Sequence, residues 1–169
     1  MILPIIGYGD PVLRKTGELL SAEHPQLQET IANMYDTMYN AYGVGLAAPQ
    51  IGLALRLFVI DTTPFSDDEE LDDAAQKQLQ GFKRTFINAK MIKEEGEEWS
   101  FNEGCLSIPD VREDVYRNPT ITIEYCEEDF VMKTEVFDGL IARVIQHEYD
   151  PIEGILFTDK ISSLKLKPN

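Results

Sequence analysis

The hydrophobic pattern of residues 24–43 predicts an amphipathic helix. Apolar side chains recur there at spacings of three and four residues, which places them on one helical face: Leu27, Ile31, Met34 and Met38. Pro25 suits the first turn of a helix, and Gly43 follows the last periodic position. We therefore expect a helix whose apolar face packs on the core.

A second helical pattern begins at Asp138, a residue type that favours the N-cap position. One stripe of this segment carries Leu140, Ile141, Val144, Ile145 and Glu148. Pro151 lacks a backbone N–H, and it disfavours helical dihedrals at the residue before it. The pattern therefore predicts a core helix from about residue 138 to about residue 150, with an early end or a kink at the proline.

Apolar runs predict four β-strands, at residues 55–61, 85–92, 120–126 and 130–137. The third run, TITIEYC, alternates apolar and polar side chains, and CEED is the turn to the return strand. Strands followed by one core helix favour an α+β fold. We expect one domain over residues 1–169, with antiparallel strands around the helix.

Composition and charge narrow the class of protein. The 169 residues are 43% hydrophobic, which is enough for one domain with a sizeable core. A net charge of −15 disfavours broad contact with nucleic acid or an anionic membrane, so we expect binding to neither. The chain begins without a signal-peptide pattern, no window holds the roughly 18 apolar residues of a membrane span, and two cysteines fit a reducing compartment. The expected location is the cytoplasm.

Two segments combine small residues with reactive ones. GVGLAAPQ (43–50) has little side-chain bulk, so its backbone can approach a ligand closely, and it ends in the amide of Gln50. A tight turn before a strand explains the same pattern. EGCLSIP (103–109) holds Cys105 in a segment too irregular for a core strand. That thiol fits either a small buried hydrophobe or a metal ligand.

The third segment is QHEYDP (146–151), which lies on the predicted core helix. In zinc helices, two histidines four residues apart share a face and hold one ion, while a glutamate between them handles protons. His147 and Glu148 match the first part of that pattern, but Pro151 occupies the position of the second histidine. By itself this segment does not predict a metal site.

In this order and at these separations, GVGLAAPQ, EGCLS and QHEYD closely resemble the three signature motifs of peptide deformylases. The segments PIIGYGDPVLRK near the start and GILFTDKIS after the third motif are similar too, so the resemblance spans nearly the whole chain. It implies an α+β fold in which a long helix carries the third motif among strands. The implied activity is removal of the formyl group from the N-terminal formyl-methionine of new bacterial proteins.

The resemblance also implies roles for individual residues. The metal would be one divalent ion, Fe(II) or its substitutes zinc and nickel, held by Cys105 and His147. Glu148 would be the general acid and base, and Gln50 with the backbone N–H of Leu106 would form the oxyanion hole. The implied substrate-binding residues are Gly43, Val44, Gly45, Arg112, Leu140 and Val144.

The partners implied are formyl-methionyl nascent peptides, with transient ribosome contact through the short basic tail KISSLKLKPN. Six acidic residues between Asp67 and Asp73 predict an exposed loop with a short helix, similar to an insertion that the family tolerates.

Pro151 is the departure from the family pattern, because the family's third ligand is a histidine at this position. Catalytic zinc sites generally have three protein ligands and a water molecule, so metal binding is expected to be weak or absent with Cys105 and His147 alone. Asp150, which resembles a residue that supports the site against Arg117, and His24 are the candidate replacement donors.

Three interpretations remain open. The chain is a deformylase with weakened activity, or an inactive relative that still binds N-terminal peptides, or a sequence in which a single-base change turned His into Pro. A metal-free thiol hydrolase using Cys105 and His147 ranks last, because EGCLS offers no group that would orient the histidine.

Overall fold

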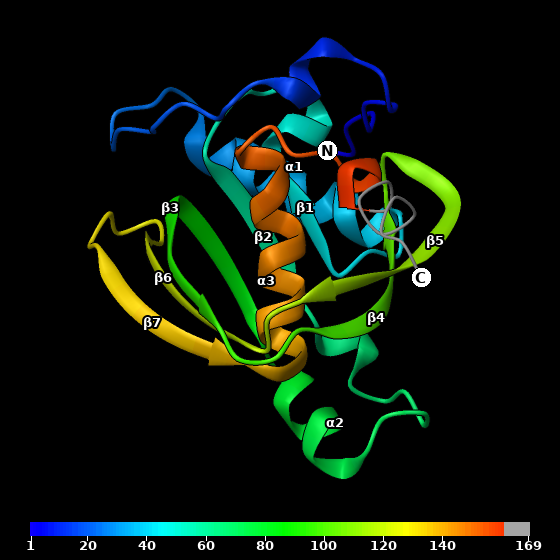
Figure 1. Cartoon of the computed structure of the whole chain (residues 1–169). Helices are drawn as coiled ribbons and strands as arrows, with labels where there is room; N and C mark the ends of the chain where they lie inside the picture. The colour runs from blue at the N-terminus through cyan, green and yellow to red at the C-terminus, as the bar shows by residue number, and fades with distance from the viewer. Residues whose placement is uncertain (161–169) are drawn as a thin grey trace.

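Two antiparallel sheets enclose the third helix of the chain (Figure 1). The computed structural model describes residues 1–160. The larger sheet has the strand order β1-β2-β3-β6-β7, and β4 pairs with β5 in a separate hairpin. The strands are β1 Gly45–Ala47, β2 Leu57–Asp61, β3 Lys83–Glu95, β4 Trp99–Cys105, β5 Ile108–Arg117, β6 Thr120–Cys126 and β7 Lys133–Asp138. The helices are α1 Leu27–Asn40, α2 Asp73–Leu79 and α3 Gly139–Ile152, with 3₁₀ turns at Pro11–Arg14, Ala48–Ile51 and Thr63–Phe65.

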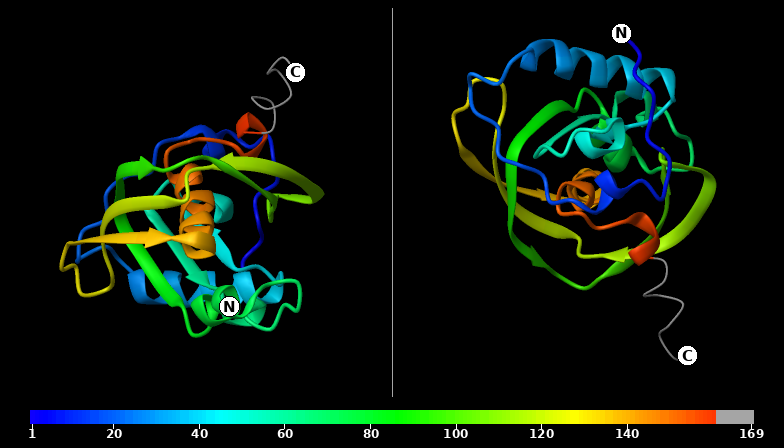
Figure 2. Two further views of the ribbon diagram at one scale, coloured as in Figure 1. Left: turned by 60° about the horizontal axis from the view of Figure 1, so that its bottom comes forward. Right: turned by 90° about the horizontal axis from the view of Figure 1, so that it is seen from above.

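The β1–β2 end of the large sheet is buried on both faces, because α1 covers one and α3 the other. Successive β2 side chains point to opposite faces, so Phe58 packs with the α3 side and Val59 with the α1 side. Met34 and Met38 of α1 have no exposed surface. Figure 2 (right) looks down α3 and shows it enclosed between the sheet and the β4–β5 hairpin. These layers confirm the predicted α+β class with antiparallel strands around a core helix.

The periodic segments are found close to their predicted positions. The strand at residues 120–126 has the predicted bounds, and the strand predicted at 85–92 extends at both ends to form β3. Pro25 was wrongly placed in the first helical turn. Helix α1 begins at Leu27, after Gln26 in a left-handed conformation with φ of 59°.

The β4–β5 hairpin was not predicted, and its position corrects the interpretation of Cys105. That residue ends β4 and is not in an irregular segment. The pairing shifts register between Gly104 and Cys105. Because such a shift breaks the two-residue alternation, the pattern gave no strand signal there.

Helix α3 continues past its predicted end at residue 150. It runs through Pro151 to Ile152, with Glu153 as C-cap. Ile152 is fully buried, and the following backbone closes the helix with bonds from Gly154 N to Pro151 O and from Ile155 N to Asp150 O, both 3.0 Å. A proline in the last turn removes one N–H, while core packing and these bonds hold the turn. The side chain of Asp138 does not cap the helix.

No helix within residues 1–160 is both long enough and apolar enough to cross a membrane. Most of the basic tail proposed to contact the ribosome lies outside the described residues.

Candidate active site

The three motifs meet in one cavity of about 620 Å³. Strand β1 brings Gly45, the following 3₁₀ turn brings Gln50, and the end of β4 brings Cys105. Helix α3 presents His147 and Glu148 to the same space. The other predicted site residues also line it: Gly43, Val44, Leu106, Arg112, Leu140 and Val144.

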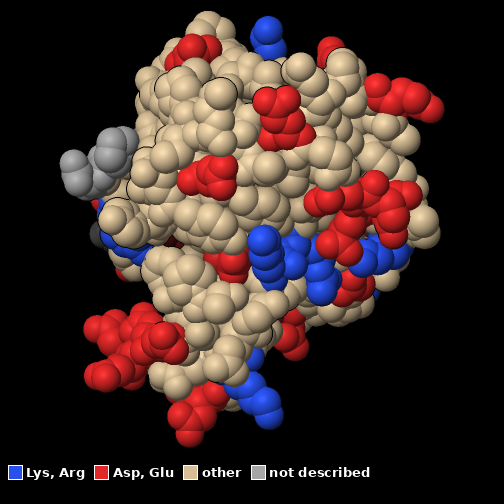
Figure 3. Space-filling view, turned by 180° about the vertical axis from the view of Figure 1, so that it is seen from behind, with Lys and Arg blue, Asp and Glu red and all other residues tan. Residues whose placement is uncertain are grey.

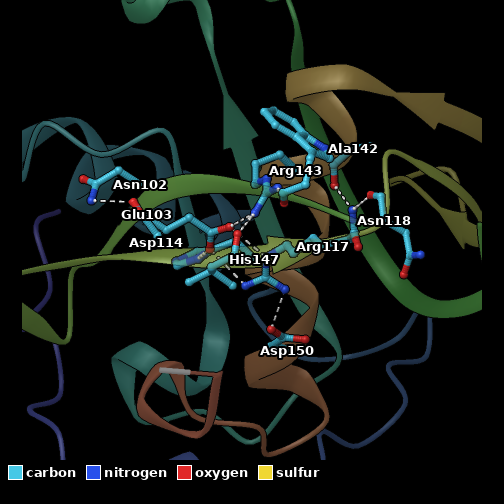
Figure 4. A network of polar contacts seen from close by, with 12 residues as sticks. Asn102, Glu103, Asp114, Arg117, Asn118, Ala142, Arg143, His147 and Asp150 are labelled. Carbon is cyan, nitrogen blue, oxygen red and sulfur yellow. Dashed lines mark hydrogen bonds and ion pairs between the residues drawn. The ribbon is translucent and has the colours of Figure 1, made fainter. Parts of the chain in front are cut away.

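A buried carboxylate fixes the ring of His147 (Figure 4). Oε1 of Glu103 lies 2.7 Å from His147 Nδ1, which leaves Nε2 as the ring nitrogen available to Cys105 in the cavity. Arg117 donates to both oxygens of Glu103 at 2.8 and 3.0 Å, and Arg143 donates to Oε2 at 2.7 Å. Asp150 pairs with Arg117 at 2.9 Å, which is the supporting position expected for it.

The network shifts the pKa values of its members. Burial disfavours the charged form of Glu103, but hydrogen bonds from His147 and Arg117 outweigh it and hold the pKa of this carboxyl well below its usual range. Burial also disfavours the His147 cation, yet hydrogen bonds with Cys105 and Glu103 raise its pKa to about 10. Burial raises the pKa of Glu148 to about 7, which suits a group that both takes and gives a proton near neutrality.

Glu103 and Arg143 were not predicted from the sequence. Glu103 lies within the quoted EGCLS motif, and Arg143 interrupts an apolar helical stripe, so each was visible as a polar residue where burial is expected. The thiol hydrolase was ranked last because EGCLS was thought to offer no group that orients the histidine. That reason was wrong, because Glu103 of EGCLS contacts His147 Nδ1.

Gln50 is oriented by its own turn. Its Oε1 accepts a hydrogen bond from Ala47 N at 2.9 Å, so Nε2 must point the other way. That amide group lies 3.6 Å from Cys105 Sγ and 3.3 Å from Ser107 Oγ. A fixed N–H donor beside Cys105 is suited to stabilise negative charge on a reacting oxygen.

The side chains present do not fit a three-ligand metal centre. Cys105 and His147 are two suitable donors, and Pro151 stands where a third would project from α3. Among the side chains that the structure describes, no group of three or more His, Cys, Asp and Glu is placed to hold an ion. Asp150 is engaged by Arg117, and His24 lies before α1 and does not line the cavity. A small second cavity of about 30 Å³ lies beside Pro151 and Cys105.

Glycine at position 45 lets β1 lie against Glu148, which yields a prediction. A Cβ added at Gly45 would lie 2.7 Å from Glu148 Cδ, so Gly45→Ala must displace the carboxylate. Since misplacing a catalytic group by about 1 Å can lower the rate about 100-fold, we expect a fall of that order in kcat/KM with little change in melting temperature. Gly7→Ala is the control, because a Cβ there meets nothing within 4 Å and Gly7 does not line the cavity. Equal losses in both variants would contradict the assignment.

The Glu103 network yields a second prediction, on stability. Glu103→Gln leaves two buried guanidinium groups without their shared anion, and we expect a loss of about 3–5 kcal/mol in the free energy of unfolding. The lowered pKa of Glu103 means that its contribution is present above the unfolded pKa of about 4.3 and is lost as pH falls further.

Urea unfolding of both proteins from pH 7 to pH 3 measures this contribution. The difference in stability should shrink on acidification. The exposed substitution Glu98→Gln should change nothing. If the difference in stability between the two proteins stayed constant from pH 7 to pH 3, the destabilisation in Glu103→Gln would come from lost packing and not from the lost charge.

An α+β domain whose core helix presents a His-Glu pair to a cysteine on a neighbouring strand has the arrangement of a hydrolase active site. The family model described as "Polypeptide deformylase" matches residues 2–167, and this chain belongs to that family. The peptide deformylase of Flavobacterium johnsoniae is 82% identical over 165 residues, which are 98% of this chain and 84% of that protein. That of Flavobacterium psychrophilum is 70% identical over the same length, with 98% and 85% covered.

Solved structures agree with the sequence relatives. The crystal structure of peptide deformylase from Thermotoga maritima matches with a TM-score of 0.81 and 32% identity, covering 95% of this chain and 97% of that one. The peptide deformylase from Legionella pneumophila gives a TM-score of 0.80 at 36% identity, with 98% and 89% covered. The predicted family and fold are therefore confirmed.

Proposed function

We propose that this chain removes the formyl group from formyl-methionyl ends of newly made proteins in the cytoplasm, at a rate lowered by Pro151. The observation that carries the proposal is the meeting of Gln50, Cys105, His147 and Glu148 in one cavity. Family membership supports the reaction, and the cavity supports the substrate class.

The cavity wall fits a methionine side chain. Leu140 and Val144 present apolar surface from α3, and Val44 does so from the segment before β1. An unbranched thioether chain fills such a surface well. In this proposal Gly43 and Gly45 let the backbone approach the substrate, and Arg112, which lines the cavity, contacts peptide carbonyl groups.

Each polar group has a distinct task in hydrolysis of the formyl amide. Glu148 takes a proton from the attacking water and returns one to the leaving amine. Gln50 Nε2 and the backbone N–H of Leu106 stabilise the developing negative charge on the carbonyl oxygen, each contributing roughly 3–4 kcal/mol. If the family's ion, Fe(II) with zinc or nickel as substitutes, were bound, Cys105 and His147 would be its donors, and two donors predict weak occupancy.

A second candidate is an inactive relative that binds N-terminal peptides without turnover. The incomplete donor set favours it, since the cavity and the oxyanion donors are retained while the third ligand is not. Both candidates predict binding of formyl-methionyl peptides, and only the first predicts release of formate.

The test measures metal content, peptide binding and formate release on the same anaerobically purified protein. Binding with formate release supports the proposed enzyme, and binding alone supports the inactive relative. Failure to bind formyl-methionyl peptides more tightly than unformylated ones would overturn both. Formate release that persists with a chelator and disappears in Cys105→Ser would instead support the thiol hydrolase, which the Glu103–His147 contact makes worth testing.

A further inference from the structure

The outer wall of the cavity is built by a segment to which the reaction assigns no role. Residues 62–79 follow β2 and contain the 3₁₀ turn Thr63–Phe65 and helix α2. Its members that line the cavity are Thr62, Phe65, Asp68, Leu71 and Leu79. Gln78 Nε2 donates to the backbone oxygen of Asp138 at 2.9 Å, which ties the segment to the start of α3. Figure 1 shows this lobe at the foot of α3, and Figure 2 (left) brings it forward.

Exposed apolar side chains gather where the cavity opens. Tyr42, Phe65 and Val111 are 89%, 43% and 37% exposed, and all three line it. Exposed apolar surface around one hollow marks a binding surface. The cavity volume of about 620 Å³ is in the range of sites for ligands larger than one side chain. With methionine against α3, the outer part is left for the residue that follows it.

Negative charge lies beside this apolar rim, on the segment that carries Phe65. Residues 67–73 carry six carboxylates, all on exposed positions, and Asp68 also lines the cavity. Figure 3 shows acidic side chains gathered on the protruding lobe at lower left. Such a field favours positively charged ligands. The guanidinium of Arg112, on the other side of the cavity, is engaged by the side chain and the backbone oxygen of Asn102, at 2.8 Å each.

We propose that this wall makes the site selective for formyl-methionyl peptides with Lys or Arg directly after the methionine. The inference rests on the proposed function, whose cavity it extends. The aliphatic stem of Lys or Arg packs on Phe65 and Tyr42, and its charged end lies near Asp68 or over an aromatic ring. A glutamate at the same place in the peptide meets the carboxylates of residues 67–73 and is disfavoured.

The test compares three formyl-Met-X peptides, with X as lysine, norleucine or glutamate, by titration calorimetry. Norleucine keeps the lysine stem and removes its charge. Binding is measured in Glu148→Ala, in which no peptide is consumed. We expect lysine to bind about two- to fivefold more tightly than norleucine, the range of an exposed ion pair, and glutamate to bind more weakly than norleucine. Raising the salt from 50 to 500 mM should shrink the lysine advantage.

Three variants locate the effect. Asp68→Asn removes the charge but keeps the side-chain oxygen that accepts a hydrogen bond from Glu70 N. In this variant the lysine and norleucine peptides should bind with nearly equal affinity. Glu69→Gln is the matched control, since it removes one charge from the same segment without lining the cavity. Phe65→Ala should weaken both peptides. Equal affinity for all three peptides overturns this inference and leaves the proposed function standing, whereas no preference for formylated over unformylated peptides overturns both.

Discussion

Pro151→His should raise the affinity for a divalent metal ion by more than 10- to 100-fold and raise formate release from a formyl-Met peptide with it. Loss of a residue that only supports a metal ligand already lowers metal affinity by about 10- to 100-fold, and this substitution would add a ligand itself. Position 151 follows His147 by one helical turn on α3, and the cavity of about 30 Å³ beside it also borders Cys105. A histidine at 151 therefore projects toward the two donors that remain.

The control for this prediction is Pro151→Ala, which restores the backbone N–H without adding a donor. Because α3 already reaches Ile152, neither substitution should lengthen the helix, and the gain in stability should fall below the roughly 3 kcal/mol of an interior proline. We expect the melting temperature to rise in both Pro151→Ala and Pro151→His, and the metal content to rise only in Pro151→His.

Metal per chain, melting temperature and peptide turnover would be measured for the three proteins side by side. If the proline form already holds one equivalent of metal and turns over like Pro151→His, another group completes the shell. Asp150 would then be tested first, and its release from Arg117 would have to accompany binding.

Glu148→Ala should lower turnover by about 100- to 10,000-fold, the usual range for loss of a general acid and base. The effect is measured in the Pro151→His background, so that the donor set is complete. Metal content should stay unchanged, because Glu148 moves protons and is not a ligand in this assignment. Cys105→Ala should remove both metal and turnover, since it deletes one of the donors.

The comparison of these two variants decides the roles. Equal loss of metal in Glu148→Ala and Cys105→Ala would show that Glu148 is itself a ligand. Cys105, His147 and Glu148 would then form a three-donor set without position 151. The interpretation that Pro151 weakens metal binding would have to be abandoned. The Glu148 side chain packs against Gly45, so its removal could disturb the fold. Circular dichroism of each variant checks that the fold is kept.

The residues that carry the chemistry could be predicted from the sequence because they lie in short, compositionally unusual segments. GVGLAAPQ and EGCLS combine small residues with a reactive side chain, QHEYD places a His-Glu pair on an apolar helical pattern, and the order of the three carried the family resemblance. Helices α1 and α3 were predicted from apolar spacing, and β6 from its alternation. These signals are local, so no tertiary information was needed to find them.

Tertiary structure decided what depends on partners distant in sequence. The chain alone does not show which partners Glu103 and Arg143 have, and only the packing of β4 and β5 against α3 buries them with Arg117 around His147. The same holds for the end of α3: proline predicts an end or a kink near residue 150, but burial of Ile152 and the closing backbone bonds keep two more residues helical. The sequence by itself determined which residues are chemically able to act. Only the three-dimensional arrangement decided which of them meet, because burial and charge pairing are properties of contacts and not of position along the chain.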